Sequence, residues 1–393
     1  MNVKYNSEKS KKTKKTISFN LYSEPKKRNK SLHKIYTSEK ENINIINIQN
    51  NNIEKKEDKK EIKKQELDFN FYKDLTNDSF VDDFFSSLNN TFTIFNSINN
   101  ILYLVYSNKE KSIISYDLKN FQKICEIKKA HNKYITNFTH TFDKMNKRDL
   151  IMSISPVDNN IKIWNANNWE CILEIKQVNK GGVVYSASFL LDINDIYILT
   201  SNYNLLSKKE PIKLFNTKAE KIYEIKLLES IVYTDCYYEN GFSQIFIIIV
   251  TQNKIFSYDY MNNCFYNEYG KIKSTYFSII IHKKNNDTKL FASNFNGGIE
   301  IYDFHSGKEL KEIKIHSRGF FGICLWDDNH LLVACYDKSI KIIDLKEKKI
   351  KKSLNGHKKY VTTLKKIYIP KVGDCLISQG MTSDSIKLWK VNK

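Results

Sequence analysis

The feature that most constrains how this chain can fold is a five-residue pattern that recurs along its last three quarters. The pattern is Ile, any residue, usually an apolar residue, usually an aromatic residue, and then usually Asp or Asn. Its seven copies begin at Ile113, Ile161, Ile212, Ile255, Ile299, Ile340 and Ile386, at intervals of 41 to 51 residues. Successive side chains of a strand point to opposite faces. Apolar side chains at adjacent positions therefore predict strands that are covered on both faces, as in stacks of packed sheets.

The surroundings of each copy indicate further strands. From about residue 88, short runs rich in Ile, Val, Tyr and Phe alternate with clusters of Asn, Asp, Gly and Lys, which is typical of strands and turns. An apolar strand and a polar turn precede the copy at 340–344, and a turn and another strand follow the copy at 299–303. No stretch has a long helical period with caps. The predicted fold class is therefore all-β, and a repeat of about 40–45 residues is typical of propeller blades.

Histidines upstream of the pattern make a family resemblance specific. Three repeats open with His131, His316 and His357, and the distance is 33 residues from His131 to Trp164 and 32 from His357 to Trp389. This arrangement resembles the WD-repeat family, in which a Gly-His pair is followed by a Trp-Asp-like pair that closes the third strand of a blade. The resemblance covers about residues 88–393. It implies a seven-bladed β-propeller of four-stranded antiparallel blades.

The resemblance also implies a network of hydrogen bonds inside the blades, made by a His, a Ser or Thr, an Asp and a Trp. The matching residues are His131, Ser155, Asp158 and Trp164 in blade two, His316 and Asp337 in blade six, and His357 and Trp389 in blade seven. One residue is inserted in the turn of blade two, and Ile343 takes the place of the Trp in blade six. Buried polar groups must be paired, so the implied role is structural. Blades that lack these residues are expected to rely on apolar packing.

The two ends of the repeat region are expected to meet. Only four residues follow Trp389, which leaves blade seven with three strands. In the family that this chain resembles, the N-terminal side commonly supplies the missing outer strand, and residues 69–85 are the natural donors. Such closure leaves no exposed strand edge. We therefore expect a propeller domain over 67–393, with a clasp strand region at 67–87 and the blades at 88–393.

The first 66 residues differ in composition from the rest. They contain 18 Lys and Arg against 9 Asp and Glu, lack a sustained period, and are predicted to be a largely disordered basic tail. Short apolar segments at 16–22 and 43–48 are the exceptions, and either could add a strand to another sheet. Lys14-Lys15 and residues 26–30 resemble a bipartite nuclear import signal, with a solvated tail as the alternative. The net charge of +19 favours acidic partners or nucleic acid, although A/T-rich codons would produce the same composition.

Sequence patterns for catalysis, metal binding and membrane insertion are missing. There is no Gly-rich phosphate loop, GxSxG, HExxH or EF-hand loop. The seven Cys form no CxxC and are predicted to be reduced intracellular thiols. The longest apolar run has six residues, whereas a membrane-spanning helix needs about 20. We expect no enzymatic activity, no cofactor, no metal and no membrane association, and an intracellular protein that is cytoplasmic or, alternatively, nuclear.

These observations favour a non-enzymatic scaffold or adaptor that docks partner proteins on a propeller face, as a monomer within a larger complex. The alternative is a nucleic-acid-associated factor, in RNA processing or ribosome assembly, that uses the basic tail. Binding residues concentrate on loops of a rigid frame. The candidates are aromatic residues where first strands begin or next to turns on the same expected face: Tyr134, Tyr185, Tyr233, Phe277, Phe295, Phe321, Tyr336 and Tyr360. The competing interpretation is that they pack in the core, because alternation along a strand turns several of them inward.

Overall fold

The computed structural model describes residues 67–76, 79, 91–176, 178, 183–193, 195–203, 211–227, 229, 231–270, 275–315, 319–381 and 384–392. The predicted tail, its import-like motif, the short segments at 16–22 and 43–48, and His316 lie outside these residues. The described residues form strands joined by turns and loops, which confirms the all-β fold class. The division of the chain into domains at residues 66 and 67 stays a prediction.

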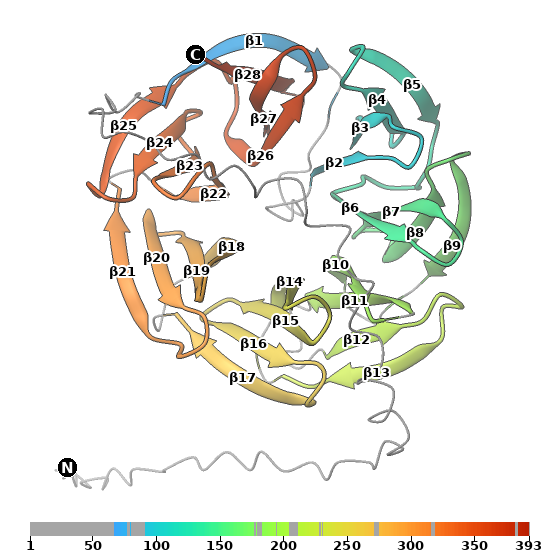
Figure 1. Ribbon diagram of the computed structural model, residues 1–393. Helices are drawn as coiled ribbons and strands as arrows, with labels where there is room; N and C mark the ends of the chain where they lie inside the picture. The colour runs from blue at the N-terminus through green and yellow to red at the C-terminus, as the bar shows by residue number, and fades with distance from the viewer. Residues whose placement is uncertain are drawn as a thin grey trace, which may run out of the picture. The chain divides into compact units, whose positions relative to one another are not determined.

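The strands form seven four-stranded antiparallel sheets, which are arranged as blades around a central axis (Figure 1). Blades 1 to 3 comprise β2 (Phe92–Asn96), β3 (Leu102–Ser107), β4 (Ile113–Asp117) and β5 (Gln122–Ile127); β6 (Asn137–Asp143), β7 (Arg148–Ser155), β8 (Asn160–Asn165) and β9 (Glu170–Lys176); and β10 (Val183–Leu191), β11 (Ile196–Tyr203), β12 (Ile212–Phe215) and β13 (Lys221–Ile225).

Blades 4 to 6 comprise β14 (Ile231–Glu239), β15 (Gln244–Thr251), β16 (Ile255–Asp259) and β17 (Cys264–Tyr269); β18 (Tyr276–Lys284), β19 (Asp287–Asn294), β20 (Gly298–Asp303) and β21 (Glu309–Lys314); and β22 (Phe320–Leu325), β23 (His330–Cys335), β24 (Ile340–Asp344) and β25 (Lys349–Leu354). Blade 7 comprises β26 (Val361–Ile369), β27 (Gly373–Gly380), β28 (Ile386–Val391) and β1 (Phe69–Thr76). The predicted seven-bladed propeller of four-stranded blades is confirmed.

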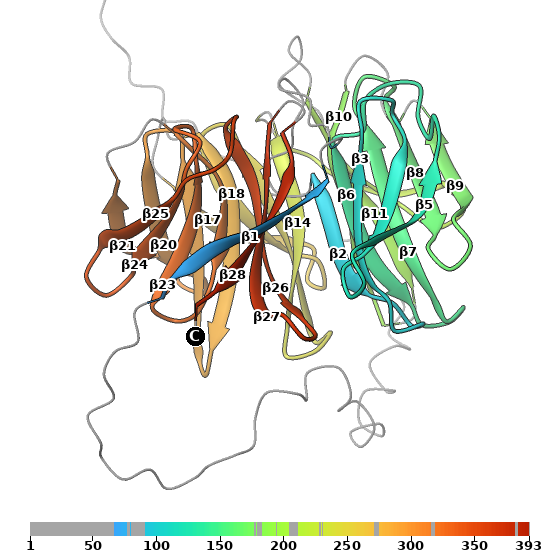
Figure 2. The ribbon, with the colours of Figure 1, turned by 90° about the horizontal axis from the view of Figure 1, so that it is seen from above.

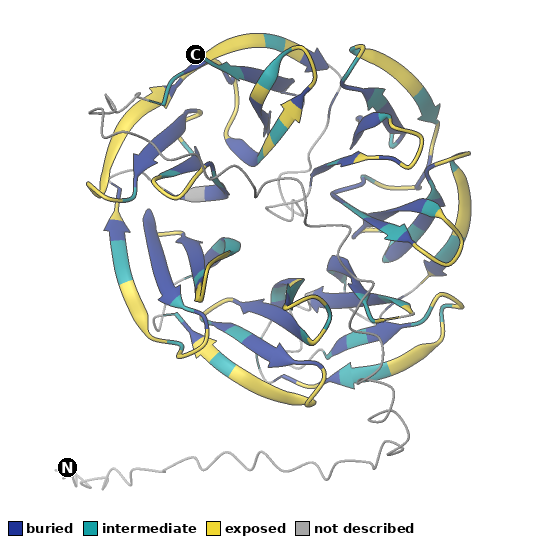
Figure 3. Ribbon diagram, in the orientation of Figure 1, coloured by how far each residue is buried: buried dark blue, intermediate teal, exposed yellow. Residues whose placement is uncertain are grey.

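The recurring five-residue pattern is the third strand of every blade. Its seven leading Ile residues are each at most 1% exposed. Second and third strands are buried on both faces, whereas the outer strands have exposed side chains (Figure 3). This explains why the first position of the pattern is apolar in every copy. A third strand lies between two strands of its own sheet and between the sheets of two neighbouring blades.

Blade 7 is closed by a strand from the other end of the chain. β1 pairs antiparallel with β28 along the rim, from Phe69 opposite Val391 to Thr76 opposite Ile386 (Figure 2). Asp74 accepts hydrogen bonds from Ser385 and Lys387, both at 2.5 Å. The donor strand therefore lies within the segment 69–85 that the sequence suggested.

The core consists of seven apolar clusters of described residues, one at each interface between neighbouring blades. β1 contributes to two of them. Phe69 packs in the cluster between blades 6 and 7, where its ring centroid lies 4.7 Å from that of Trp326. Leu75 packs in the cluster between blades 7 and 1. The closing strand is therefore part of the core on both sides of its blade.

Candidate docking surface

The complete hydrogen-bond network that the family resemblance implied occurs in blade 7. His357 is held between Asp384, 3.0 Å from its Nδ1, and Ser378, 2.7 Å from its Nε2. The indole Nε1 of Trp389 donates to the same Ser378 hydroxyl at 2.7 Å. Burial alone would raise the pKa of Asp384, but hydrogen bonds from His357 and from backbone amides lower it. The sequence analysis identified His357 and Trp389 but not Ser378 and Asp384.

Blade 2 contains a shorter version, and one predicted member must be corrected. The hydroxyl that joins His131 to Trp164 belongs to Ser153, at 2.8 Å from both, and not to Ser155. Ser155 and the backbone amide of Lys133 donate instead to Asp158. Nδ1 of His131 has no hydrogen-bond partner among the described residues, and burial lowers the pKa of His131 to about 3.

The position of the Asp within the turn, and not an inserted residue, explains the difference between the two blades. Both serines lie 11 residues before their Trp. Asp384 lies five residues before Trp389, whereas Asp158 lies six residues before Trp164. The carboxylate of Asp158 is therefore displaced by one position and accepts from the loop backbone instead of from His131. The constant spacing between Ser and Trp is the sequence signal that could have identified Ser153 and Ser378.

Blades 5 and 6 replace the network with other polar contacts. In blade 6, Asp337 accepts from Ser339 at 2.5 Å and pairs with Lys341 at 2.7 Å. In blade 5, the buried carboxylate of Glu300 accepts from the hydroxyls of Tyr276 and Tyr302 and from the side-chain amide of Asn294. No sequence signal pointed to Glu300, because it occupies the variable position of the repeated pattern.

The eight candidate docking residues divide into three groups by exposure. Phe295 and Tyr360 are exposed, at 55% and 39%. Tyr134, Tyr185, Phe277 and Tyr336 are partly exposed. Tyr233 and Phe321 are buried, at 7% and 4%, so the expectation that they face a partner is wrong for these two side chains. Their positions early in first strands turn them toward the neighbouring blade, as alternation along a strand permits.

Five of the eight rings are in continuous contact across three blades. Phe277 lies 5.8 Å from Phe295 and 5.7 Å from Phe321, between ring centroids. Phe321 stacks on Tyr336 at 4.8 Å, and Tyr336 lies 4.3 Å from Tyr360. We call Phe295, Phe277, Phe321, Tyr336 and Tyr360 the aromatic ridge. Its two ends are the exposed rings of Phe295 in blade 5 and Tyr360 in blade 7.

Tight turns hold the ridge in place. The backbone amides of Lys358 and Lys359 donate to Asp384 at 3.0 and 3.1 Å, and the carbonyl of Tyr360 accepts from Met381 at 2.8 Å. Gly319 has a positive φ of 65° and lies against the ring of Tyr336, 3.0 Å from where a Cβ would be. The network of blade 7 therefore also fixes the loop that carries Tyr360.

Lysines flank the ridge and lack carboxylate partners within the described structure. Lys338, Lys358 and Lys359 are exposed, on the same turns as Tyr336 and Tyr360. None of the ion pairs found between described residues involves them. Asp337, the nearest carboxylate in sequence, already pairs with Lys341, and hydrogen bonds from Lys341 and Ser339 outweigh burial and lower its pKa.

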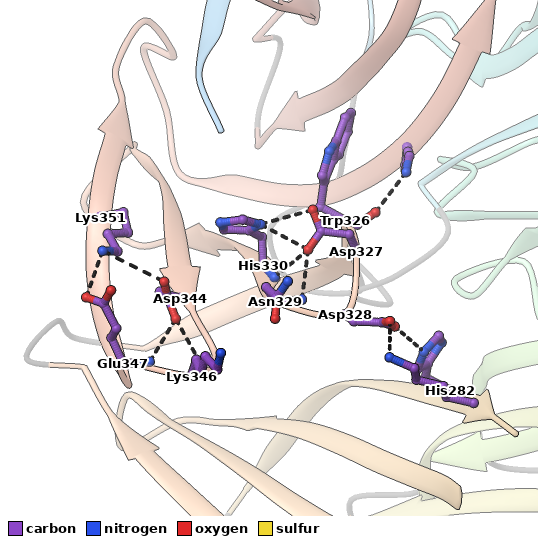
Figure 4. Close-up of polar contacts among 12 residues, drawn as sticks. His282, Trp326, Asp327, Asp328, Asn329, His330, Asp344, Lys346, Glu347 and Lys351 are labelled. Atoms are coloured by element: carbon purple, nitrogen blue, oxygen red, sulfur yellow. Dashed lines mark hydrogen bonds and ion pairs between the residues drawn. The ribbon is translucent and has the colours of Figure 1, made fainter. Parts of the chain in front are cut away.

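On the opposite face of blades 5 and 6, several side chains contact carboxylates. Asp328 bridges to His282 and Lys284 of blade 5, with a distance of 3.2 Å to His282 (Figure 4). On the same face, Asp327 accepts from His330 at 2.9 Å, and Lys351 pairs with Glu347 at 2.7 Å (Figure 4).

A cavity of about 580 Å³ lies between β14, β18, β22 and β26, the first strands of blades 4 to 7. Asp235 and Lys365 are among its lining residues, and the Tyr233 hydroxyl donates to Asp235 at 2.6 Å. Although the Asp235 side chain is exposed to this cavity, loss of solvation raises its pKa.

Across the described parts of the chain, no group of three or more His, Cys, Asp or Glu could hold a metal ion. Nor does that part of the chain contain a helix with the length and hydropathy of a membrane span.

Comparisons with known proteins agree with this architecture. The family model described as "WD domain, G-beta repeat" matches residues 307–344, which take in β21 to β24 and end at Asp344. The crystal structure of BBS1N in complex with ARL6DN, soaked with mercury, is similar with a TM-score of 0.60 and 12% identity over 80% of this chain and 96% of that chain. The crystal structure of BBS1N in complex with ARL6DN, soaked with lead, is similar with a TM-score of 0.60 and 11% identity over 80% of this chain and 97% of that chain. No curated protein matches the chain.

Proposed function

Because this chain is a seven-bladed propeller in which residues 307–344 match the WD-repeat family model, we propose that it is a non-enzymatic interaction scaffold whose protein partners dock on the aromatic ridge. The observation that carries the proposal is the continuous contact of five rings from three blades, ending in two exposed side chains. BBS1N, which is similar in fold, was crystallised in complex with ARL6DN. A protein partner on a domain of this fold therefore has a precedent.

The physical properties of the ridge support docking. Aromatic side chains bury a large area with few rotatable bonds, and they are enriched at the centres of interfaces. Here the buried ring of Phe321 and the partly exposed rings beside it hold the exposed ends in fixed positions. A partner would therefore bind a surface that is already ordered, which reduces the entropy cost of association.

The test is affinity purification from the native cell with the full chain, followed by mass spectrometry. Phe295→Ala and Tyr360→Ala should each reduce recovery of the specific partners by about tenfold or more, since aromatic hot-spot residues are worth about 2 kcal/mol. Neither change should lower the melting temperature by more than about 2 °C, because both side chains lie at the surface.

Tyr368→Ala is the matched control. Tyr368 is 64% exposed at the other end of β26, away from the ridge. Its removal should leave partner recovery unchanged. If the two ridge variants recover the same partners in the same amounts as the parent, the ridge is not the docking surface.

A further inference from the structure

We propose that the segment that occupies the aromatic ridge is an acidic peptide with apolar side chains between its carboxylates. This inference rests on the proposed function, since it names the chemistry of the partner at the same surface. The ridge supplies an apolar strip, and Lys338, Lys358 and Lys359 supply uncompensated positive charge on the turns beside it. A complementary partner must therefore carry negative charge next to apolar side chains.

The distribution of charge supports an anionic partner. Residues 67–393 carry a net charge of +10, which is the +19 of the chain less the +9 of residues 1–66. Residues 341–373 alone contain eleven Lys, one Asp and one Glu. Much of the net charge is therefore concentrated in blades 6 and 7.

The lysines beside the ridge differ from several other cations of these blades in their partners. On the face shown in Figure 4, carboxylates pair with Lys284 and Lys351 and contact the imidazoles of His282 and His330. Beside the ridge, the described residues offer no such partners to Lys358 and Lys359, whose backbone amides are nevertheless fixed by Asp384. The lysines are therefore anchored at the backbone while their ammonium groups remain available to a ligand.

The geometry of the rings favours a peptide over single-stranded nucleic acid. Bases bind such surfaces by stacking on open aromatic faces. Tyr336 lies between Phe321 and Tyr360, at 4.8 and 4.3 Å, so its faces are taken up by those rings. Phe321 is buried. The accessible part of the ridge is therefore an apolar surface made by its exposed and partly exposed rings, which suits aliphatic and aromatic side chains of a peptide.

The experiment is a selection of random dodecapeptides, displayed on phage, against the immobilised full chain. Asp and Glu should be enriched in the selected peptides together with Leu, Ile, Phe or Met. Affinities of the synthesised peptides are then measured by fluorescence anisotropy. The double variant Lys358→Glu with Lys359→Glu should weaken binding by about tenfold or more, because two attractions become repulsions. Replacing Glu by Gln in the peptide should weaken binding to the parent chain similarly.

The matched control is Lys346→Glu with Lys371→Glu, which changes the net charge equally at exposed sites on the opposite face. It should change affinity by less than about twofold. Selected peptides without acidic enrichment would overturn the proposal. Equal affinity of the selected peptides for the parent chain and for the Lys358→Glu, Lys359→Glu variant would overturn it as well.

The outcomes separate this inference from the proposed function. If neutral peptides are selected and Tyr360→Ala weakens them, the ridge docks proteins but the acidic partner is wrong. If no peptide is selected, or Tyr360→Ala leaves every affinity unchanged, both proposals fail. A parallel titration uses single-stranded oligouridylate as the probe. Binding of this probe that is lost in Tyr360→Ala would overturn the peptide proposal in favour of nucleic acid.

Discussion

At the scale of single residues, Ser153 is the side chain whose role differs most from the sequence-based expectation. Its hydroxyl is shared by His131 and Trp164, whereas Ser155 contacts only Asp158. Ser153→Ala should lower the free energy of unfolding by about 1–3 kcal/mol, because it leaves two buried groups without a partner. Ser155→Ala should cost less than about 1 kcal/mol. Denaturant titration of both variants is the measurement, and equal losses would contradict the assignment of Ser153.

The buried imidazole of His131 makes stability depend on pH. Its pKa is about 3 in the folded protein, because of burial and then of Lys162, against 6.5 as the ordinary value. The unfolded chain therefore binds one more proton at this site between pH 6.5 and 3. Stability due to this group is complete above pH 6.5 and falls on acidification, by about 1.4 kcal/mol per pH unit within the window.

Unfolding measured from pH 7 to pH 4 in the parent chain and in His131→Gln tests this dependence. Carboxylates contribute to the slope in both proteins, so the difference between the two slopes isolates His131. The variant should be less stable at pH 7 but should lose less stability on acidification. Parallel curves would mean that the imidazole is protonated in the folded protein.

At the scale of elements, β1 should be essential while the residues before it are not. Removing residues 1–60 should leave the melting temperature within about 2 °C of the parent, whereas removing residues 1–87 should lower it by about 5 °C or more. The reason is that Phe69 and Leu75 are buried in two separate interblade clusters, and each side chain is worth about 1.5–3 kcal/mol. Differential scanning calorimetry of both truncations provides the comparison.

A pair of point variants checks that β1 acts through packing. Phe69→Ala with Leu75→Ala in the full chain should reproduce most of the loss, and Tyr72→Ala, on the exposed side of the same strand, should not. Equal melting temperatures for the two truncations would show that β1 does not hold the ring closed.

The strands were predictable from the sequence to the extent that burial restricts composition. The third strand of each blade is covered on both faces, so apolar residues had to stand at adjacent positions, as at Ile342 and Ile343. Whether the Asp joins the network was not predictable in the same way. It depends on where the Asp stands within a turn of unchanged length, and the displacement of Asp158 by a single residue changes which donors its carboxylate reaches.

At the scale of the whole molecule, the ridge required the three-dimensional arrangement. The sequence placed aromatic residues at similar positions in six blades, and nothing in the spacing distinguished Tyr185 from Phe277. Ring contacts depend on the separation of neighbouring blades, and among the eight candidates the continuous contacts join rings of blades 5 to 7. The concentration of lysines was visible in the sequence at 341–373, but their pairing with carboxylates was not.

The pairing of β1 with β28 has a consequence for the order of events during synthesis. Asp74 and its hydrogen-bond partner Ser385 are 311 residues apart. At about 5–20 residues per second, the ribosome needs about 15–60 s to make the partner of a strand that it has already released. During that interval β1 has no strand to pair with, and the cluster between blades 7 and 1 lacks one side. Nascent chains are therefore committed to an open arc until the last blade emerges, and a chaperone that covers Phe69 and Leu75 would have to leave before the ring could close.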